Sequence, residues 1–352
     1  MTQRLKRTEL ALAAQMIQAG ELVAFPTETV YGLGADATNA AAVKKVYAAK
    51  GRPSDNPLIV HVSSFEQVKK YAVLPNDYAA TLVKAFWPGP LTLILPIKHG
   101  ALDPIVTGGL KTAAFRMPRN QLTRDLIDLA GVPLVGPSAN TSGKPSPTLA
   151  DHVLHDLSGK IAGVLDDGPT DVGVESTVLD LSVVPPVILR PGAVTREMLL
   201  QYIPDVLDNH HHVAKDEIPK APGMKYKHYA PNAQVYIVNS TDPDKFQSAV
   251  KWGLAQNQEV GLLATDAIIA SQHLLRFKNQ FSLGEDIQSA SHQLFDGLRY
   301  FDLNPEIKLI IAQGFPRQGL GEAYMNRLEK SAGSEYLQID DQQVSVIREM
   351  TR

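Results

Sequence analysis

Short apolar runs, several of them alternating with polar residues, recur through the first 200 positions and are bounded by Pro or Gly. Runs of this length with these boundaries are typical of β-strands. The predicted strands are Glu21–Phe25, Pro57–Val62, Leu91–Ile97, Thr112–Arg116, Pro133–Gly136, Thr177–Leu181 and Pro186–Arg190. One helical pattern between them starts at a capping residue, Asn39, and runs to Lys50, after which Gly51 and Pro53 act as stop signals. The first part of the chain is therefore predicted to be mixed α/β.

The periodicity is lost between Pro204 and Pro231, in a stretch that contains Pro219, Pro222 and Gly223. This stretch is predicted to be a long linker. Uncommitted loops of such length inside a compact protein are usually functional or disordered. We therefore expect the linker to reach back over a site.

A second series of apolar runs and helical patterns follows the linker. The predicted strands are Gln234–Val238, Glu259–Ala264 and Ile307–Gln313, and the predicted helices are Pro243–Gln256, Glu285–Asp302 and Gly319–Lys330. This alternation predicts a small Rossmann-like α/β domain. No G-x-G-x-x-G motif follows a strand, so the topology gives no reason to expect a dinucleotide.

The length of 352 residues is about twice that of one domain, which agrees with two domains that each bury a core. No apolar run approaches the roughly 18 residues that a membrane-spanning helix needs. Cysteine is absent, which excludes disulfides, thiolate zinc sites and cysteine nucleophiles. Residues Met1–Leu10 are polar and basic, without the apolar core of a signal peptide. A soluble, cytoplasmic protein is expected.

The net charge of −3 is spread without a strongly basic part. Residues 1–232 carry 23 Lys and Arg against 22 Asp and Glu, and residues 233–352 carry 11 against 15, so the two parts have charges of +1 and −4. Bulk electrostatics therefore do not indicate nucleic-acid binding, and any contact with RNA is expected to be local.

Familiar catalytic motifs are missing: the chain has no G-x-x-x-x-G-K-[ST] loop, kinase signature, G-x-S-x-G elbow or H-E-x-x-H. Polar residues do gather in loops and strand ends of the first part, where a fold without function favours ordinary turn residues. The first such segment, Phe25–Gly34, combines hydroxyls, a carboxylate and two glycines. It can offer N–H and hydroxyl groups to a small polar ligand, and a tight turn is the alternative interpretation.

The second polar segment is Lys50–His61. A helix end already explains the lysine, glycine and proline at its start, because a cation complements the helix dipole there and Gly and Pro terminate helices. A helix end does not explain Arg52 or Asn56. The functional interpretation is that Lys50 and Arg52 clamp a triphosphate, since Arg offers a planar fork and Lys a compact charge to phosphate oxygens.

His61 belongs to the same segment and lies in the predicted strand Pro57–Val62. Strand alternation places it on the face opposite Leu58, Val60 and Val62. A lone strand histidine is usually structural or exposed, so only its neighbours make His61 a candidate ligand residue.

Two further segments combine a strand with polar side chains. Thr112 and Arg116 lie on one face of a predicted strand, where a buried arginine is costly unless it pairs with an anion; a solvated face is the alternative. The loop Gly136–Lys144 is rich in hydroxyls, and Ser138 and Asn140 can bind a carboxylate or phosphate.

The last polar segments are Glu175–Asp180 and Ile188–Ala193. Each has a polar group at the terminus of a predicted strand, which is where open α/β sheets bind ligands.

The order and spacing of these segments resemble one family. The matching residues are Lys50-x-Arg52, Asn56-Pro57-Leu58, Ser138-Ala139-Asn140, Glu175-Ser176-Thr177 and Arg190-Pro191-Gly192. Together they are similar to the YrdC-like domain of the threonylcarbamoyl-AMP synthase family, over roughly residues 10–203. The long form of that family adds a linker and a small Rossmann-like domain, and Lys227–Pro231 resembles its linker signature.

The resemblance implies three parts: a catalytic YrdC-like twisted mixed-sheet α/β domain at 1–203, a linker that acts as an active-site lid at 204–232, and a small Rossmann-like domain at 233–352. It implies a nucleotidyltransferase that converts L-threonine, bicarbonate or CO2 and ATP to threonylcarbamoyl-AMP and pyrophosphate. Partner transferase proteins would then modify an adenosine beside the tRNA anticodon, and any direct tRNA contact would be weak.

The implied chemistry needs no protein nucleophile, because the threonine amine captures CO2 and the carbamate oxygen attacks the α-phosphorus. It needs orientation and charge cancellation while pyrophosphate leaves. Lys50, Arg52 and Arg190 are the expected suppliers of charge, with Mg²⁺ bridging the phosphates.

The family's site residues carry over by motif, with Lys50 and Arg52 as the catalytic pair. Threonine would contact Thr29, His61, Arg116, Ser138 and Ser176. ATP would contact Lys50, Arg52, Asn56, Thr112, Asn140, Arg190, Tyr229, and either Ser146 or Thr148. Because Tyr229 belongs to the linker, the linker would shield the labile intermediate from water.

Three alternative interpretations follow from the same residues. A non-catalytic RNA-binding module would show salt-sensitive RNA binding without ATP turnover, and the near-neutral first part argues against it. A carbamoyltransferase of the hydrogenase-maturation kind resembles a fusion with acylphosphatase and cysteine zinc-finger parts, which a chain without cysteine does not contain. The run His210–His212 suggests a metal, yet three adjacent residues cannot all face one ion in a regular element.

Overall fold

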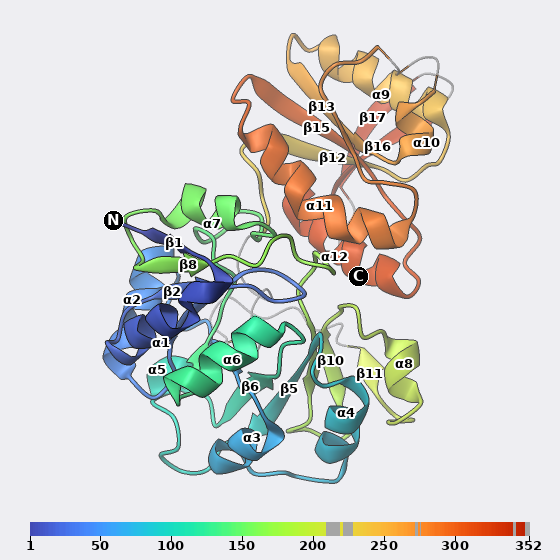
Figure 1. Cartoon of the computed structure of the whole chain (residues 1–352). Coiled ribbons are helices and arrows are strands. Elements are labelled where there is room, and N and C mark those ends of the chain that lie inside the picture. Colours follow the sequence, from blue (N-terminus) through green and yellow to red (C-terminus); the bar gives the residue numbers. More distant parts are fainter. Residues whose placement is uncertain (209–218, 221–227, 272–273, 275, 341–342, 349–352) are drawn as a thin grey trace. The chain divides into compact units, whose positions relative to one another are not determined.

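The computed structural model describes residues 1–208, 219–220, 228–271, 274, 276–340 and 343–348 (Figure 1). The chain divides into two compact units. The first comprises Met1–Ser142 and Ser146–Tyr226, and the second comprises Gly143–Pro145 and Lys227–Arg352. A three-residue piece of the first part of the sequence thus belongs to the second unit.

A mixed 11-stranded sheet runs through the first unit in the order β1-β8-β2-β3-β7-β4-β6-β5-β9-β10-β11. Its strands are β1 (Gln3–Leu5), β2 (Val23–Phe25), β3 (Gly32–Asp36), β4 (Ile59–His61), β5 (Leu91–Pro96), β6 (Thr112–Arg116), β7 (Leu134–Val135), β8 (Gly163–Leu165), β9 (Thr177–Asp180), β10 (Val187–Arg190) and β11 (Leu207–Asp208). Parallel and antiparallel neighbours alternate in the middle of the sheet, since β4 pairs with β6 in parallel and β5 with β6 antiparallel. The mixed-sheet α/β fold expected for this part is confirmed.

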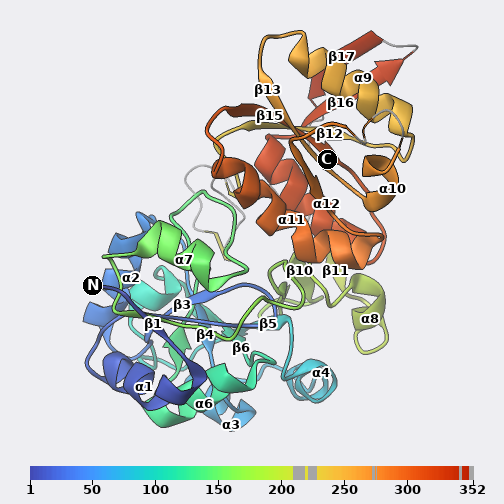
Figure 2. The same ribbon diagram turned by 45° about the horizontal axis from the view of Figure 1, so that its top comes forward.

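The helices of the first unit are short and lie around this sheet (Figures 1 and 2). They are the 3-10 helix η1 (Arg7–Glu9) and the α-helices α1 (Leu10–Gln18), α2 (Ala40–Lys50), α3 (Phe65–Tyr71), α4 (Tyr78–Phe86), α5 (Pro104–Thr107), α6 (Gln121–Ala130), α7 (Ala150–Leu157) and α8 (Arg196–Leu200). The predicted ends of α2 are confirmed, because the Asn39 side chain accepts from the backbone N–H groups of Ala41 and Ala42 and Gly51 adopts φ 62°.

The second unit contains a six-stranded sheet in the order β14-β13-β15-β12-β16-β17, in which only β17 runs antiparallel to its neighbour. Its elements are β12 (Gln234–Val238), α9 (Pro243–Leu254), β13 (Glu259–Ala264), α10 (Asp266–Ile269), β14 (Gln280–Ser282), α11 (Ile287–Asp302), β15 (Ile307–Gln313), α12 (Leu320–Ala332), β16 (Glu335–Asp340) and β17 (Gln343–Arg348).

Helices cover both faces of this second sheet (Figure 2). Phe246 of α9 packs with Leu262 and Ile311 in the core on one face. On the other face α11 approaches closely, since an added Cβ at Gly261 would lie 2.7 Å from the ring of Phe301. A parallel sheet buried on both faces is the arrangement that βαβ connections produce, and the predicted small Rossmann-like unit is confirmed.

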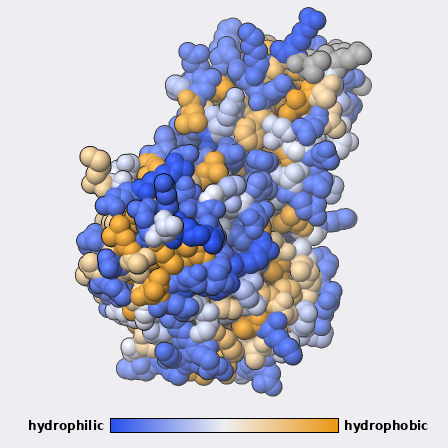
Figure 3. Space-filling view, in the orientation of Figure 1, coloured by the Kyte–Doolittle hydropathy of each residue, from blue (hydrophilic) through white to orange (hydrophobic). Residues whose placement is uncertain are grey.

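No helix among the described residues is long and apolar enough to cross a membrane. On the face drawn in Figure 3 polar side chains predominate, while apolar ones gather over α1 and α6 of the first unit. Leu12 and Leu129 are the large apolar residues that these two helices expose.

Candidate active site

One face of the first sheet carries several of the predicted site residues. His61 ends β4 and Arg116 ends β6, and the two are register partners in neighbouring parallel strands, so their side chains share a face. Leu58, Val60 and Val62 belong to the main core, as the alternation of β4 predicts. The site face is lined by a small separate cluster made of Ile59, Ile94, Ala114 and Val178.

Arg116 is buried on this face and already has protein partners. Its Nη2 lies 2.7 Å from Oε1 of Glu28, its Nη1 donates to Oγ1 of Thr29 at 2.8 Å, and its Nε donates to the carbonyl oxygen of Gly89 at 3.4 Å. The structure therefore brings together two of the residues predicted to contact threonine, Thr29 and Arg116. Glu28 is the carboxylate of the first polar segment, and the sequence does not predict it as a site residue because nothing local indicates its partner.

His61 is fully enclosed beside Arg116. Burial, and then the positive charge of Arg116, lower the pKa of His61 to about 3, so the imidazole is neutral at physiological pH. Its Nδ1 has no hydrogen-bond partner among the described residues. An added Cβ at Gly136 would lie 2.6 Å from that nitrogen, which explains why glycine precedes the Ser138 loop.

Ser176 and Arg190 meet at the same end of the sheet. The Ser176 hydroxyl lies 2.8 Å from Oγ1 of Thr92, and Arg190 donates from Nε to the Ser176 carbonyl oxygen at 3.1 Å and from Nη2 to the hydroxyl at 3.3 Å. Gly192 permits this approach, since an added Cβ there would lie 2.2 Å from the backbone nitrogen of Thr177. A residue predicted for ATP, Arg190, therefore lies beside one predicted for threonine.

Lys50, at the end of α2, binds the loop that carries Ser138 and Asn140. Its ammonium donates to the backbone carbonyl oxygens of both residues, and only 2% of Lys50 is exposed. Lys50 therefore organises this loop in addition to complementing the helix dipole. Ser138 is also tied to the sheet by a bridge to Gly32.

Arg52 donates hydrogen bonds to backbone oxygens of the segment that precedes β4. Its Nε donates to the carbonyl oxygen of Asn56 at 3.3 Å and its Nη2 to that of Pro57 at 3.2 Å. The hydroxyl of Tyr47 also donates to the Asn56 carbonyl oxygen, and burial raises the pKa of Tyr47 to about 12, so it remains a donor. The side-chain Oδ1 of Asn56 is buried without a hydrogen-bond partner in the described structure.

The remaining predicted ATP residues of the first unit differ in their surroundings. Ser146 donates to Oε1 of Glu175 at 2.6 Å. Glu175 belongs to the motif Glu175-Ser176-Thr177, but no ligand contact was predicted for it. The Thr148 hydroxyl lies 3.5 Å from Nδ1 of His152. Thr112 is half-buried at the start of β6, on the same face as Arg116.

The linker is described only in part. Lys220 pairs with the buried carboxylate of Asp180 at 3.0 Å within the first unit. Tyr229 belongs to the second unit, where its ring centroid lies 5.2 Å from that of Phe295, and it adopts φ 65°. The predicted lid segment lies largely outside the described residues, as do Lys227 and the His210–His212 run.

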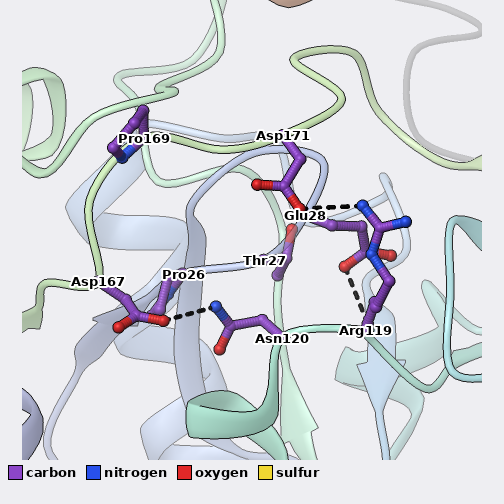
Figure 4. A pocket seen from close by; sticks show the side chains of 8 residues that line it. All are labelled: Pro26, Thr27, Glu28, Arg119, Asn120, Asp167, Pro169 and Asp171. Carbon is purple, nitrogen blue, oxygen red and sulfur yellow. Dashed lines mark hydrogen bonds and ion pairs between the residues drawn. The ribbon is translucent and has the colours of Figure 1, made fainter.

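A polar pocket borders the loop that carries Glu28 (Figure 4). Its lining includes Thr27, Glu28, Arg119 and Asp171, and Arg119 pairs with Asp171 at 2.9 Å. Of the residues that line it, none is among the predicted site residues. Within the described part of the chain, no group of three or more His, Asp or Glu side chains could hold a metal ion.

Two protein-family models match the chain. A model described as telomere recombination, Sua5_yciO_yrdC, matches residues 15–192, and a model described as the C-terminal domain of threonylcarbamoyl-AMP synthase matches residues 194–333. The threonylcarbamoyl-AMP synthase of Bacillus subtilis is 47% identical over 325 residues, which are 92% of this chain and 93% of that protein. That of Pyrococcus abyssi is 43% identical over 342 residues, which are 96% of this chain and 98% of that protein.

A solved structure is similar over the same span. The crystal structure of P. abyssi Sua5 complexed with L-threonine has a TM-score of 0.88 and 41% sequence identity to this chain. The similarity covers 95% of this chain and 98% of that chain, so it includes both units and not one alone.

Proposed function

Because the chain belongs to the threonylcarbamoyl-AMP synthase family, we propose that it condenses L-threonine, bicarbonate or CO2 and ATP into threonylcarbamoyl-AMP and pyrophosphate. The observation that carries this proposal is the match of both units to the family at 47% and 43% identity. The site agrees with it, since one sheet face presents two buried arginines and several hydroxyls. The non-catalytic RNA-binding interpretation is therefore not favoured.

Threonine is proposed to bind at the end of the sheet where β4 and β6 terminate. Arg116 pairs with the carboxylate of the amino acid, because its guanidinium is buried and held in place on this face. Thr29 and Ser176 offer hydroxyls beside it, and Ser138 contributes from its loop. His61 lies beside Arg116, and its neutral imidazole adds no second positive charge next to the guanidinium.

The first chemical step is proposed to form the carbamate. The ammonium group of threonine first loses a proton to solvent. The free amine attacks CO2, so that a C–N bond forms while one C=O π bond opens, and the nitrogen then loses a second proton to solvent to give the carbamate. Because Arg116 binds the carboxylate of threonine, that carboxylate stays away from the α-phosphorus. The carbamate oxygen then attacks the α-phosphorus, and the bond from phosphorus to the leaving pyrophosphate breaks.

ATP is proposed to extend along the same face toward Lys50 and Arg52. These two cations, together with Arg190, offset the negative charge of the departing pyrophosphate. Thr112 and Asn140 line the path, and Ser146 or Thr148 offers a hydroxyl to the nucleotide. The proposed role of Tyr229 is to complete this part of the site from the linker.

Magnesium is proposed to bind chiefly through the phosphates. Mg²⁺ prefers oxygen ligands and commonly keeps several waters and substrate phosphates around it. The buried Asn56 Oδ1, which has no hydrogen-bond partner among the described residues, is an oxygen of the kind that fits. When bound, the ion would neutralise phosphate charge.

The product is a mixed carbamic–phosphoric anhydride, which water hydrolyses. We propose that transferase proteins consume it to modify an adenosine beside the tRNA anticodon. Direct binding of tRNA by this chain would be weak, given the charge of +1 over residues 1–232.

Pyrophosphate release tests the proposed function. The wild type, Arg52→Ala and Arg116→Ala are assayed with ATP and bicarbonate in the presence of each amino acid in turn. We expect release that depends on threonine, and a loss of at least about a hundredfold in kcat/KM for each variant, since a charged contact to the transition state is removed. Release that is independent of threonine, or full activity of both variants, would refute the proposal.

A further inference from the structure

We propose that Glu28 is a positioning residue that orients Arg116 toward the carboxylate of the amino-acid substrate. This inference rests on the proposed function, because it assumes that Arg116 binds that carboxylate. Glu28 and Arg116 have side-chain exposures of 1% and 4%, and their ion pair has a separation of 2.7 Å.

The contacts of Arg116 fix its guanidinium without consuming it. A guanidinium has five N–H groups. The Thr29 hydroxyl accepts one from Nη1, and the Gly89 carbonyl oxygen accepts the one on Nε. Nη2 forms an ion pair with Glu28 but has no hydrogen-bond partner among the described residues. Each terminal nitrogen therefore retains at least one N–H, so the group can still donate to both oxygens of a substrate carboxylate.

Glu28 is itself held in place by the backbone around it. Its Oε2 accepts from the backbone N–H of Arg119 at 3.0 Å, and its carbonyl oxygen accepts from the backbone N–H of Val172 at 2.7 Å. The Thr27 hydroxyl closes the turn, because it accepts from the backbone N–H groups of Thr29 and Val30. Figure 4 shows the Glu28 side chain beside Arg119 at the polar pocket. With Oε2 held by Arg119, Oε1 stays beside Nη2 of Arg116, so the carboxylate can impose one orientation on the guanidinium.

The ion pair between Glu28 and Arg116 also lowers the cost of burying the arginine. A buried arginine without an anion is costly, and Arg116 has to stay on the site face before any substrate arrives. Glu28 supplies the anion from within the fold. The substrate carboxylate then joins an arginine that is already oriented, so less entropy is lost on binding.

The test compares two ligands that differ only in the group Arg116 binds. L-threonine and L-threoninol share the amine and the hydroxyl-bearing side chain, but threoninol has no carboxylate. Calorimetry of both with the full-length chain gives an affinity ratio for the wild type, Glu28→Gln and Arg116→Ala. Glutamine cannot accept at both positions that Glu28 occupies, because one of its two terminal atoms is a donor.

We expect the wild type to prefer threonine, and Glu28→Gln and Arg116→Ala each to lower that preference by at least about tenfold, the size of a charged hydrogen bond. The affinity for ATP should stay within about twofold. If Glu28→Gln keeps the wild-type ratio while Arg116→Ala loses it, the inference about Glu28 fails and the proposed function stands. If Arg116→Ala keeps the ratio, the carboxylate assignment itself is wrong.

Matched variants separate positioning from a general loss of structure. Glu329→Gln alters another buried carboxylate paired with an arginine, Arg317, in the second unit, and should leave the ratio unchanged. Glu28→Asp keeps the charge but is shorter by one methylene, and should give an intermediate ratio. If Glu28→Gln does not fold, a wild-type ratio in Glu28→Asp would still contradict the inference.

Discussion

His61 shows at the residue scale how surroundings decide what a side chain does. The sequence predicts the strand face on which His61 lies. It does not predict which groups enclose the imidazole and keep it neutral. Burial and the charge of Arg116 both disfavour the imidazolium, and together they lower the pKa from 6.5 to about 3. A histidine that titrates near neutrality would instead switch charge within the site.

The lowered pKa of His61 predicts a pH-dependent stability. Between pH 6.5 and 3 the unfolded chain binds a proton at this position and the folded chain does not. The free energy of unfolding therefore decreases as the pH falls through this window. From pH 7 to pH 5 the wild type should lose about 2 kcal/mol more than His61→Asn in free energy of unfolding.

Denaturant unfolding at the two pH values measures this difference. The chain has two tryptophans, Trp87 in the first unit and Trp252 in the second, so a Trp252→Phe background makes the fluorescence report the first unit. Parallel pH profiles of the two proteins would show that His61 does not stay neutral in the fold.

At the scale of elements, local signals predicted the longer strands and helices well. Thr112–Arg116, Gln234–Val238, Glu259–Ala264 and Ile307–Gln313 have the predicted bounds, because each is an apolar run between clear breaks. Other predicted strands were one or two residues too long at one or both ends: the strand predicted from Pro57 to Val62, for example, is Ile59–His61. Proline and glycine mark a turn without stating where pairing stops.

Several strands were not predicted, because their own residues carry a weak strand signal. β3 contains two glycines, and β16 and β17 alternate too many polar residues to give an apolar signal. β1 and β8 have three residues each and are defined by pairing with one another across the chain. Pairing partners of this kind are a property of the fold and not of the segment.

The candidate site shows the same division between local and tertiary information. The motifs predicted that Thr29 and Arg116 belong together, and the structure places them in contact. The contacts of Glu28 and Glu175 were not predicted, because the sequence neighbours of a carboxylate do not reveal which distant residue it meets. Lys50 was predicted as a helix-end cation, and its bond to the Ser138 loop required the tertiary structure.

At the scale of the whole molecule, the second unit includes three residues from a polar stretch that contains residues predicted to bind ATP. Gly143–Pro145 groups with that unit, although it lies between two predicted ATP residues, Asn140 and Ser146. The backbone N–H of Ala230 donates to the Gly143 carbonyl oxygen at 2.9 Å, and Nη2 of Arg299 donates to that of Pro145. Helix α11 thus fixes Gly143–Pro145 within the second unit.

This arrangement predicts that Arg299→Ala weakens the use of ATP. The substitution removes the hydrogen bond from Arg299 to the Pro145 carbonyl oxygen, so the loop next to Ser146 is held less firmly. The KM for ATP should rise about tenfold in steady-state pyrophosphate release, while the KM for threonine stays within about twofold. The exposed Lys308→Ala in the same unit serves as the control, and equal behaviour of the two variants would contradict the prediction.

The most direct test of the account identifies the product. Wild-type protein is incubated with ATP, L-threonine and ¹³C-bicarbonate, and the nucleotide products are weighed by mass spectrometry. With Arg116 on the threonine carboxylate, we predict an adenylate that carries threonine and one ¹³C atom, formed in step with pyrophosphate. An unlabelled threonyl adenylate would contradict the account, because the carboxylate and not a carbamate would then have attacked the phosphorus.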